Sequence, residues 1–82
     1  MSDQQTRREH LAAATRIVVG AQFGSVATVQ RKLGITHAET VNLMVELERY
    51  DIVGPVVGTK PRAVLVAPDG LAEVLDQIRG GA

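Results

Sequence analysis

The tripeptide Gly-Ile-Thr at positions 34–36 separates two short amphipathic segments, and this turn constrains the fold more than any other feature of the chain. Before it, Val26, Val29 and Leu33 recur at helical spacing, and Ser25 stands where a helix N-cap belongs. The glycine of the turn suits a helix C-terminus, because the left-handed backbone needed there favours glycine or asparagine. The sequence therefore predicts a helix, a tight turn and a second helix.

The second helix of this pair is expected to begin at a capping box. Thr36 and Glu39 are spaced so that each side chain can bond a backbone amide of the first turn. The inward face is predicted to carry Thr40, Val41, Leu43, Met44 and Leu47. Ala38, Asn42 and Val45 fall away from that face, so we expect them to be exposed.

Two β-branched runs follow, over residues 52–57 and 62–66, with turn residues between them at 58–61. Pro55 cannot donate to a ladder, so the first run is predicted to be an edge strand or an interrupted one. The order helix, turn, helix and hairpin predicts an α+β fold, the winged helix-turn-helix, in which the two-stranded β-hairpin is the wing. A winged helix most often binds duplex DNA.

One further helix is expected on each side of this unit. The first begins near Asp3 or Thr6 and ends between Gly20 and Gly24. The last covers about residues 69–79 and carries an apolar stripe of Leu71, Val74, Leu75 and Ile78. That stripe could cover the first helix, or it could form the seam of a homodimer. The prediction is thus a single domain over residues 1–82, with three helices, a wing and one extra C-terminal helix.

Composition excludes several function classes. The chain has no cysteine and no stretch near the about 18 apolar residues of a membrane span, and its polar start holds no signal segment. We therefore expect a cytoplasmic protein without a membrane partner. Net charge is zero, yet residues 1–45 carry five cations against three acids, so a local basic face is compatible with the neutral total.

Catalytic and metal chemistry is not predicted. Ser25 and His37 lack a third group for nucleophilic catalysis, and the two histidines, His10 and His37, do not belong to a clustered ligand set. A short aliphatic chain has little room for a concave site of about 300 Å³ or more. The expectation is a non-enzyme with no cofactor, no metal and no small-molecule substrate.

Three groups of residues carry a resemblance to a known family. They are Ser25, Gln30, Arg31, Leu33 and Ile35; then Leu43, Leu47, Glu48 and the run from Asp51 to Pro55; then Arg62, Val64 and Leu65. Over about residues 11–67 the chain resembles the gamma domain of FtsK/SpoIIIE-type DNA translocases. The resemblance implies a winged helix that binds short G-rich polarity sequences on duplex DNA and can touch a recombinase. No Walker A loop is present, so we expect a free-standing or excised copy without the motor.

The resemblance also implies which residues would read bases. The family's third helix typically opens Tyr-Asn-Arg-Ala-Ala-Arg, with an acid three residues further on, whereas positions 37–42 here read His-Ala-Glu-Thr-Val-Asn and position 45 is valine. Base contacts are thereby assigned to Ala38, Asn42 and Val45. Asn42 could pair with adenine, and the two apolar residues could touch thymine methyl groups, which shifts the expected target from G-rich towards A·T pairs.

Contacts to the DNA backbone are predicted for Arg31, Lys32, His37, Lys60 and Arg62. A solvated face is the alternative for the cations, and a packing role is the alternative for His37. A second hypothesis is a protein–protein adaptor that does not bind DNA. It is favoured by the zero net charge, by Glu39 and Glu46 on the exposed face, and by Val45 in the open.

Overall fold

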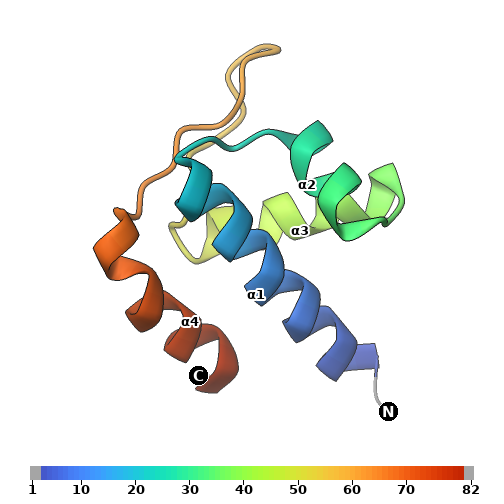
Figure 1. Cartoon of the computed structure of the whole chain (residues 1–82). Helices are drawn as coiled ribbons and strands as arrows, with labels where there is room; N and C mark the ends of the chain where they lie inside the picture. The colour runs from blue at the N-terminus through green and yellow to red at the C-terminus, as the bar shows by residue number, and fades with distance from the viewer. Residues whose placement is uncertain (1–2, 81–82) are drawn as a thin grey trace.

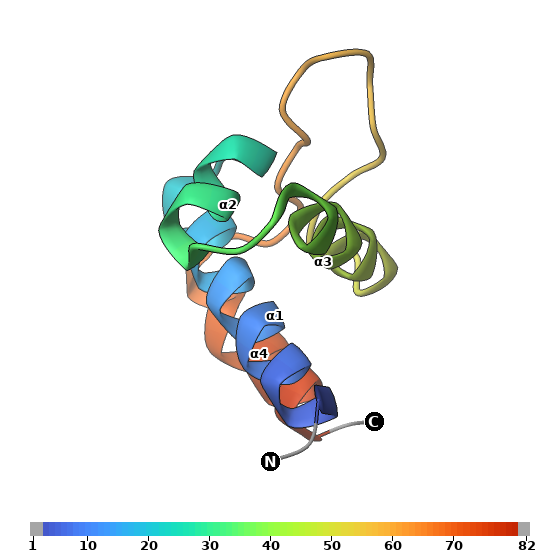
Figure 2. The same ribbon diagram turned by 90° about the vertical axis from the view of Figure 1, so that its right-hand side faces the viewer.

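The computed structural model describes residues 3–80, and this part of the chain is mostly helical (Figure 1). The elements in chain order are α1 (Asp3–Ala21), α2 (Val26–Leu33), α3 (His37–Arg49), the 3-10 turn η1 (Pro68–Gly70) and α4 (Leu71–Gly80). Figures 1 and 2 show α4 running back along α1 in the opposite direction. The start of α1 and the end of α4 consequently lie at the same end of the molecule.

The helix boundaries follow the local signals of the sequence. Ser25 caps α2 by accepting a hydrogen bond from the Thr28 amide at 3.3 Å, and Gly34 ends it with φ of 64°. Thr36 and Glu39 form the predicted capping box at the start of α3. The end of α1 at Ala21 falls within the predicted interval. These predictions are confirmed. They could be made from the sequence because each depends only on residues within three or four positions of one another.

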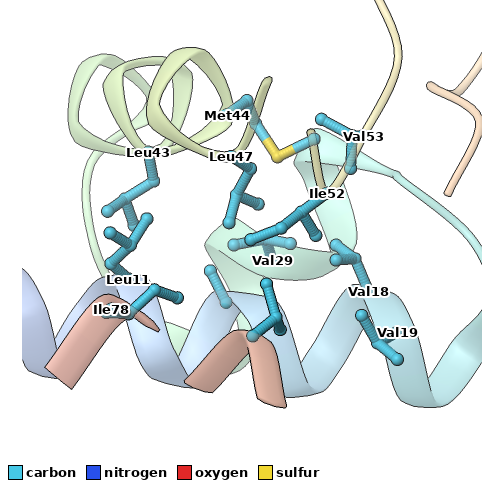
Figure 3. Packing of buried hydrophobic residues seen from close by; sticks show 12 residues of the cluster. Leu11, Val18, Val19, Val29, Leu43, Met44, Leu47, Ile52, Val53 and Ile78 are labelled. Atoms are coloured by element: carbon cyan, nitrogen blue, oxygen red, sulfur yellow. The ribbon is translucent and has the colours of Figure 1, made fainter. Parts of the chain in front are cut away.

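The apolar core draws on all four helices and on Ile52 and Val53, which lie shortly after the end of α3 (Figure 3). Leu47 from α3 and Ile52 are fully buried at its centre. From α4, Val74, Leu75 and Ile78 are buried as well, and α4 packs mainly on α1. Of the two roles considered for the last helix, packing on the first helix is therefore the one observed.

The predicted α+β class and its β-hairpin wing are wrong. Residues 3–80 contain no strand. Residues 52–65 pair with one another only in two isolated bridges, of Val53 with Val64 and of Val57 with Lys60. Extending the first bridge would place Val56 opposite Pro61, which has no N–H to donate. The ladder is therefore interrupted there, and only the isolated Val57–Lys60 bridge remains beyond it before the segment folds back as a loop.

This segment, which we call the 54–61 loop, projects from the helices beside α2 and α3 (Figures 1 and 2). Its base is held by a third bridge, in which Gly24 and Arg62 exchange backbone hydrogen bonds of 3.2 and 3.1 Å. Val56 and Val57 on the loop are 63% and 61% exposed, so the β-branched side chains that suggested a strand have no sheet to pack in. Val41, expected in the core, is 39% exposed on α3. Within the described residues, no helix has the length and apolar character needed to cross a membrane.

Candidate nucleic-acid interface

The outer face of α3 presents the three residues assigned to base contacts. Ala38, Asn42 and Val45 are all exposed, and their spacing of four and three positions places them on one side of the helix. The opposite side, with Met44 and Leu47, is buried in the core. Since an α-helix fits the major groove of B-DNA, this face has the shape needed to present side chains to base edges.

Glu39 lies at the beginning of the same helix, and its carboxylate is already engaged. Its Oε1 accepts hydrogen bonds from the Thr36 amide at 3.1 Å and from the Thr36 hydroxyl at 2.9 Å. These two bonds hold the pKa of Glu39 below its ordinary value, and the nearby charge of His10 lowers that pKa slightly further. The carboxylate is therefore charged at neutral pH and serves as a helix cap.

Four of the predicted backbone contacts are exposed. Arg31 and Lys32 occupy the last turn of α2, and His37 is the first residue of α3, so these three lie at the adjoining ends of the two helices. Lys60 is exposed on the 54–61 loop, beyond the other side of α3. The cations thus lie around the exposed face of α3 and not over the buried face.

Arg62, the fifth predicted contact, is directed into the fold. One terminal nitrogen, Nη1, donates to the Met44 carbonyl oxygen at 3.1 Å and to Glu48 Oε1 at 3.1 Å. Its side chain is only 11% exposed. Arg62 therefore ties the end of the 54–61 loop to α3, and this placement argues against a phosphate contact.

Gly24 makes this arrangement possible. A Cβ atom at Gly24 would lie 2.5 Å from the Arg62 carbonyl oxygen, closer than a side chain can approach a backbone. The loop between α1 and α2 can therefore bond to the Arg62 backbone only with glycine at this position.

Two hollows flank α3. A groove of about 400 Å³ lies between α3, the start of α2 and the 54–61 loop, and its walls include Val41, Val56 and Lys60. On the other side, a cleft of about 350 Å³ separates α3 from the first part of α1. We call this second hollow the α1–α3 cleft. It is lined by Thr6, Arg7, His10, Glu39, Asn42 and Leu43.

Sequence reasoning missed Arg7 and His10 as site residues. Arg7 reads as part of a solvated terminus or an arm, and His10 reads as an isolated histidine. Their place beside Asn42 depends on how α1 crosses α3, and no local signal encodes that crossing. Among the described residues, no group of three His, Cys, Asp or Glu side chains could hold a metal ion.

The sequence model of the family described as Ftsk gamma domain matches residues 5–67, which is 63 of the 82 residues. The chain belongs to the FtsK gamma domain family. The matched range includes most of α1, all of α2 and α3, and the 54–61 loop, whereas η1 and α4 lie beyond it. The resemblance found in the motifs around the turn is thereby confirmed.

Curated relatives agree with this assignment. The chain is 49% identical to the DNA translocase FtsK of Mycobacterium leprae over 69 residues, which is 84% of this chain. It is 49% identical to the DNA translocase FtsK of Streptomyces coelicolor over 70 residues and 42% identical to that of Corynebacterium glutamicum over 72, or 85% and 88% of this chain. In each case the match spans only 8% of the relative's length. No solved structure matches the chain significantly.

Proposed function

We propose that this FtsK gamma domain binds duplex DNA with α3 in the major groove. The observation that carries the proposal is the exposed face of α3, with Asn42 at its middle and cations at its borders. The relatives are named DNA translocases, which supports DNA as the ligand class. We infer a binding role without catalysis or cofactor, exercised in the cytoplasm where chromosomal DNA lies.

Base contacts are proposed for Ala38, Asn42 and Val45. An asparagine amide can bond adenine N6 and N7 together, and such a bidentate pair is worth about 1–3 kcal/mol of discrimination. Alanine and valine side chains suit the thymine methyl group. The preferred target would then contain A·T pairs where the family's G-rich target has guanine.

Phosphate contacts are proposed for Arg31, Lys32, His37 and Lys60, with Arg62 holding the loop. Each neutralised phosphate contributes roughly −0.9 to the slope of log K against log salt, so three or four contacts give a slope of about −3 to −4. The same contacts set the register of α3 on the duplex but carry no sequence information.

Fluorescence anisotropy with a labelled random-duplex pool tests this proposal from low to physiological salt. Lys60→Ala should weaken binding and make the slope of log K against log salt less negative by about one. Arg79→Ala is the matched control, because it removes one cation from α4, away from α3. Asn42→Ala should change the sequences selected from the pool more than it changes the total affinity. Flat anisotropy for the wild type at low salt would refute duplex binding.

The second candidate is a protein–protein adaptor. It is favoured by exposed apolar side chains on α3 and on the 54–61 loop, with Val45 at 45% and Val56 at 63% exposure. A wild type that ignores duplex at low salt but retains a partner after Lys60→Glu would support it. We do not extend the proposal to a homodimer through α4, because Val74 and Ile78 are already buried in the monomer. A sedimentation mass of one chain is therefore expected.

A further inference from the structure

The α1–α3 cleft brings two basic side chains of α1 beside the face of α3. Arg7 and His10 are three positions apart, so they lie on the same side of α1, and both line the cleft opposite Asn42. Arg7 is exposed and His10 is half-buried, which leaves both accessible from the mouth of the cleft. A cleft of about 350 Å³ is large enough to admit a phosphate group.

The α1–α3 cleft offers more hydrogen-bond donors to an anionic ligand than acids that would repel it. Among the described residues that line it, Arg7 is a cation, His10 can become one, and Glu39 is the acid. The Glu39 carboxylate accepts hydrogen bonds from the amide and hydroxyl of Thr36 through Oε1, so one of its two oxygens is engaged in capping α3. The Arg7 guanidinium, the His10 imidazole and the Asn42 amide remain as groups that can donate to a phosphate oxygen.

The position of the cleft relative to the loop adds a second argument. Lys60 borders the groove on one side of α3, and the α1–α3 cleft borders its other side; Figures 1 and 2 show α1 and the 54–61 loop on either side of that helix. A helix lying in the major groove has one phosphate backbone on each side. The loop can therefore meet one strand while the cleft meets the other.

We propose that Arg7 and His10 form a binding site for a backbone phosphodiester of the strand opposite the one contacted by Lys60. This inference rests on the proposed function, because it assumes that α3 enters the major groove. Asn42 lines the cleft and also belongs to the outer face of α3, so a phosphate held in the cleft sets how far Asn42 reaches towards the adjacent base. Arg7 and His10 thus complete a clamp around α3.

The test is a comparison of Arg7→Ala with Arg8→Ala in the duplex anisotropy assay. Arg8 is the next residue on the same helix, is exposed and does not line the cleft, so both variants lose one cation from the same place in the sequence. At about 0.1 M salt, loss of one phosphate contact should lower the association constant about eightfold. The slope of log K against log salt should become less negative by about 0.9. Arg8→Ala should stay within about twofold of the wild type. His10→Ala should weaken binding, while His10→Gln, which keeps a donor, should retain more of it.

The outcomes separate this inference from the proposed function. If the wild type binds duplex and both arginine variants lose the same affinity, the α1–α3 cleft is not a phosphate site, although duplex binding stands. A wild type that fails to bind at low salt overturns both. Thermal unfolding of each variant, expected to match the wild type because Arg7 and Arg8 are exposed, shows that any affinity change comes from the contact.

Discussion

Replacement of Arg62 by alanine distinguishes a residue that contacts DNA from one that holds the fold. The sequence predicts a phosphate contact, whereas the structure directs the Arg62 guanidinium to the Met44 carbonyl oxygen and to Glu48, each at 3.1 Å. The side chain is 11% exposed, so water does not readily replace these bonds when the guanidinium is removed. Arg62→Ala should therefore destabilise the protein before any DNA is added.

The magnitude follows from the two contacts. A charge-assisted hydrogen bond in a largely buried place contributes about 1.5–3 kcal/mol. The bond to Glu48 adds little, because that carboxylate is 45% exposed and exposed ion pairs are typically worth about 0.2–1 kcal/mol. We expect a loss of about 2 kcal/mol in the free energy of unfolding. For a chain of this size, that loss lowers Tm by roughly 8–16 °C.

Urea and thermal unfolding followed by circular dichroism measure this loss. Glu48→Gln removes the ion pair but keeps the bond to Met44, so it should cost no more than about 1 kcal/mol. Lys60→Ala, on the exposed part of the loop, should stay within about 0.5 kcal/mol of the wild type. If Arg62→Ala unfolds like the wild type but binds duplex DNA less tightly, the reasoning is refuted and Arg62 is a DNA contact.

Three other perturbations test the fold. Gly34→Ala should lower the free energy of unfolding by about 1 kcal/mol, because φ is 64° at that position. Gly20→Ala, within α1 and with open space around it, should raise the free energy of unfolding by up to about 1 kcal/mol. Equal changes for the two variants in urea unfolding would contradict this. Leu47→Ala should cost about 2–5 kcal/mol, since Leu47 is fully buried, and a loss below about 1 kcal/mol would contradict the assigned core. The lowered pKa of Glu39 means that its ionised form is favoured in the folded state. Its contribution should be complete above the ordinary pKa of 4.5 and should disappear as pH falls through the lower folded value. Unfolding of the wild type and Glu39→Gln across this range should therefore converge at acid pH, and a constant difference would argue against the capping role of the carboxylate.

The helices and their ends could be predicted from the sequence because their signals are local. Ser25 and its Thr28 partner are three residues apart, and so are Thr36 and Glu39. The absence of a β-hairpin could not be predicted, because the β-branched residues of this segment suggest strands. An antiparallel ladder needs an N–H donor at each hydrogen-bonded pair, and the register that would make Val56 and Pro61 such a pair appears only when the two segments are placed side by side.

The candidate interface likewise contains residues whose placement could be predicted from the sequence and one whose placement could not. Exposure of Ala38, Asn42 and Val45 follows from helical periodicity, and it was predicted from the sequence. The inward role of Arg62 could not be predicted, because its partners Met44 and Glu48 lie 18 and 14 positions away on another element. An arginine beside a turn has the same local pattern whether it points to solvent or to a helix.

By itself, the sequence determined the helices, their caps, the face of α3 that is exposed and the family to which the chain belongs. Each of these depends on periodicity, on contacts within one turn of a helix, or on residue identity. Only the tertiary structure decided that the 54–61 segment is a loop, that α4 covers α1 and that the α1–α3 cleft places Arg7 beside Asn42. Those features arise from the angles at which helices pack and from the donors available across the chain. Residues that are distant in sequence, such as Arg7 and Asn42, come to lie side by side only when the core forms.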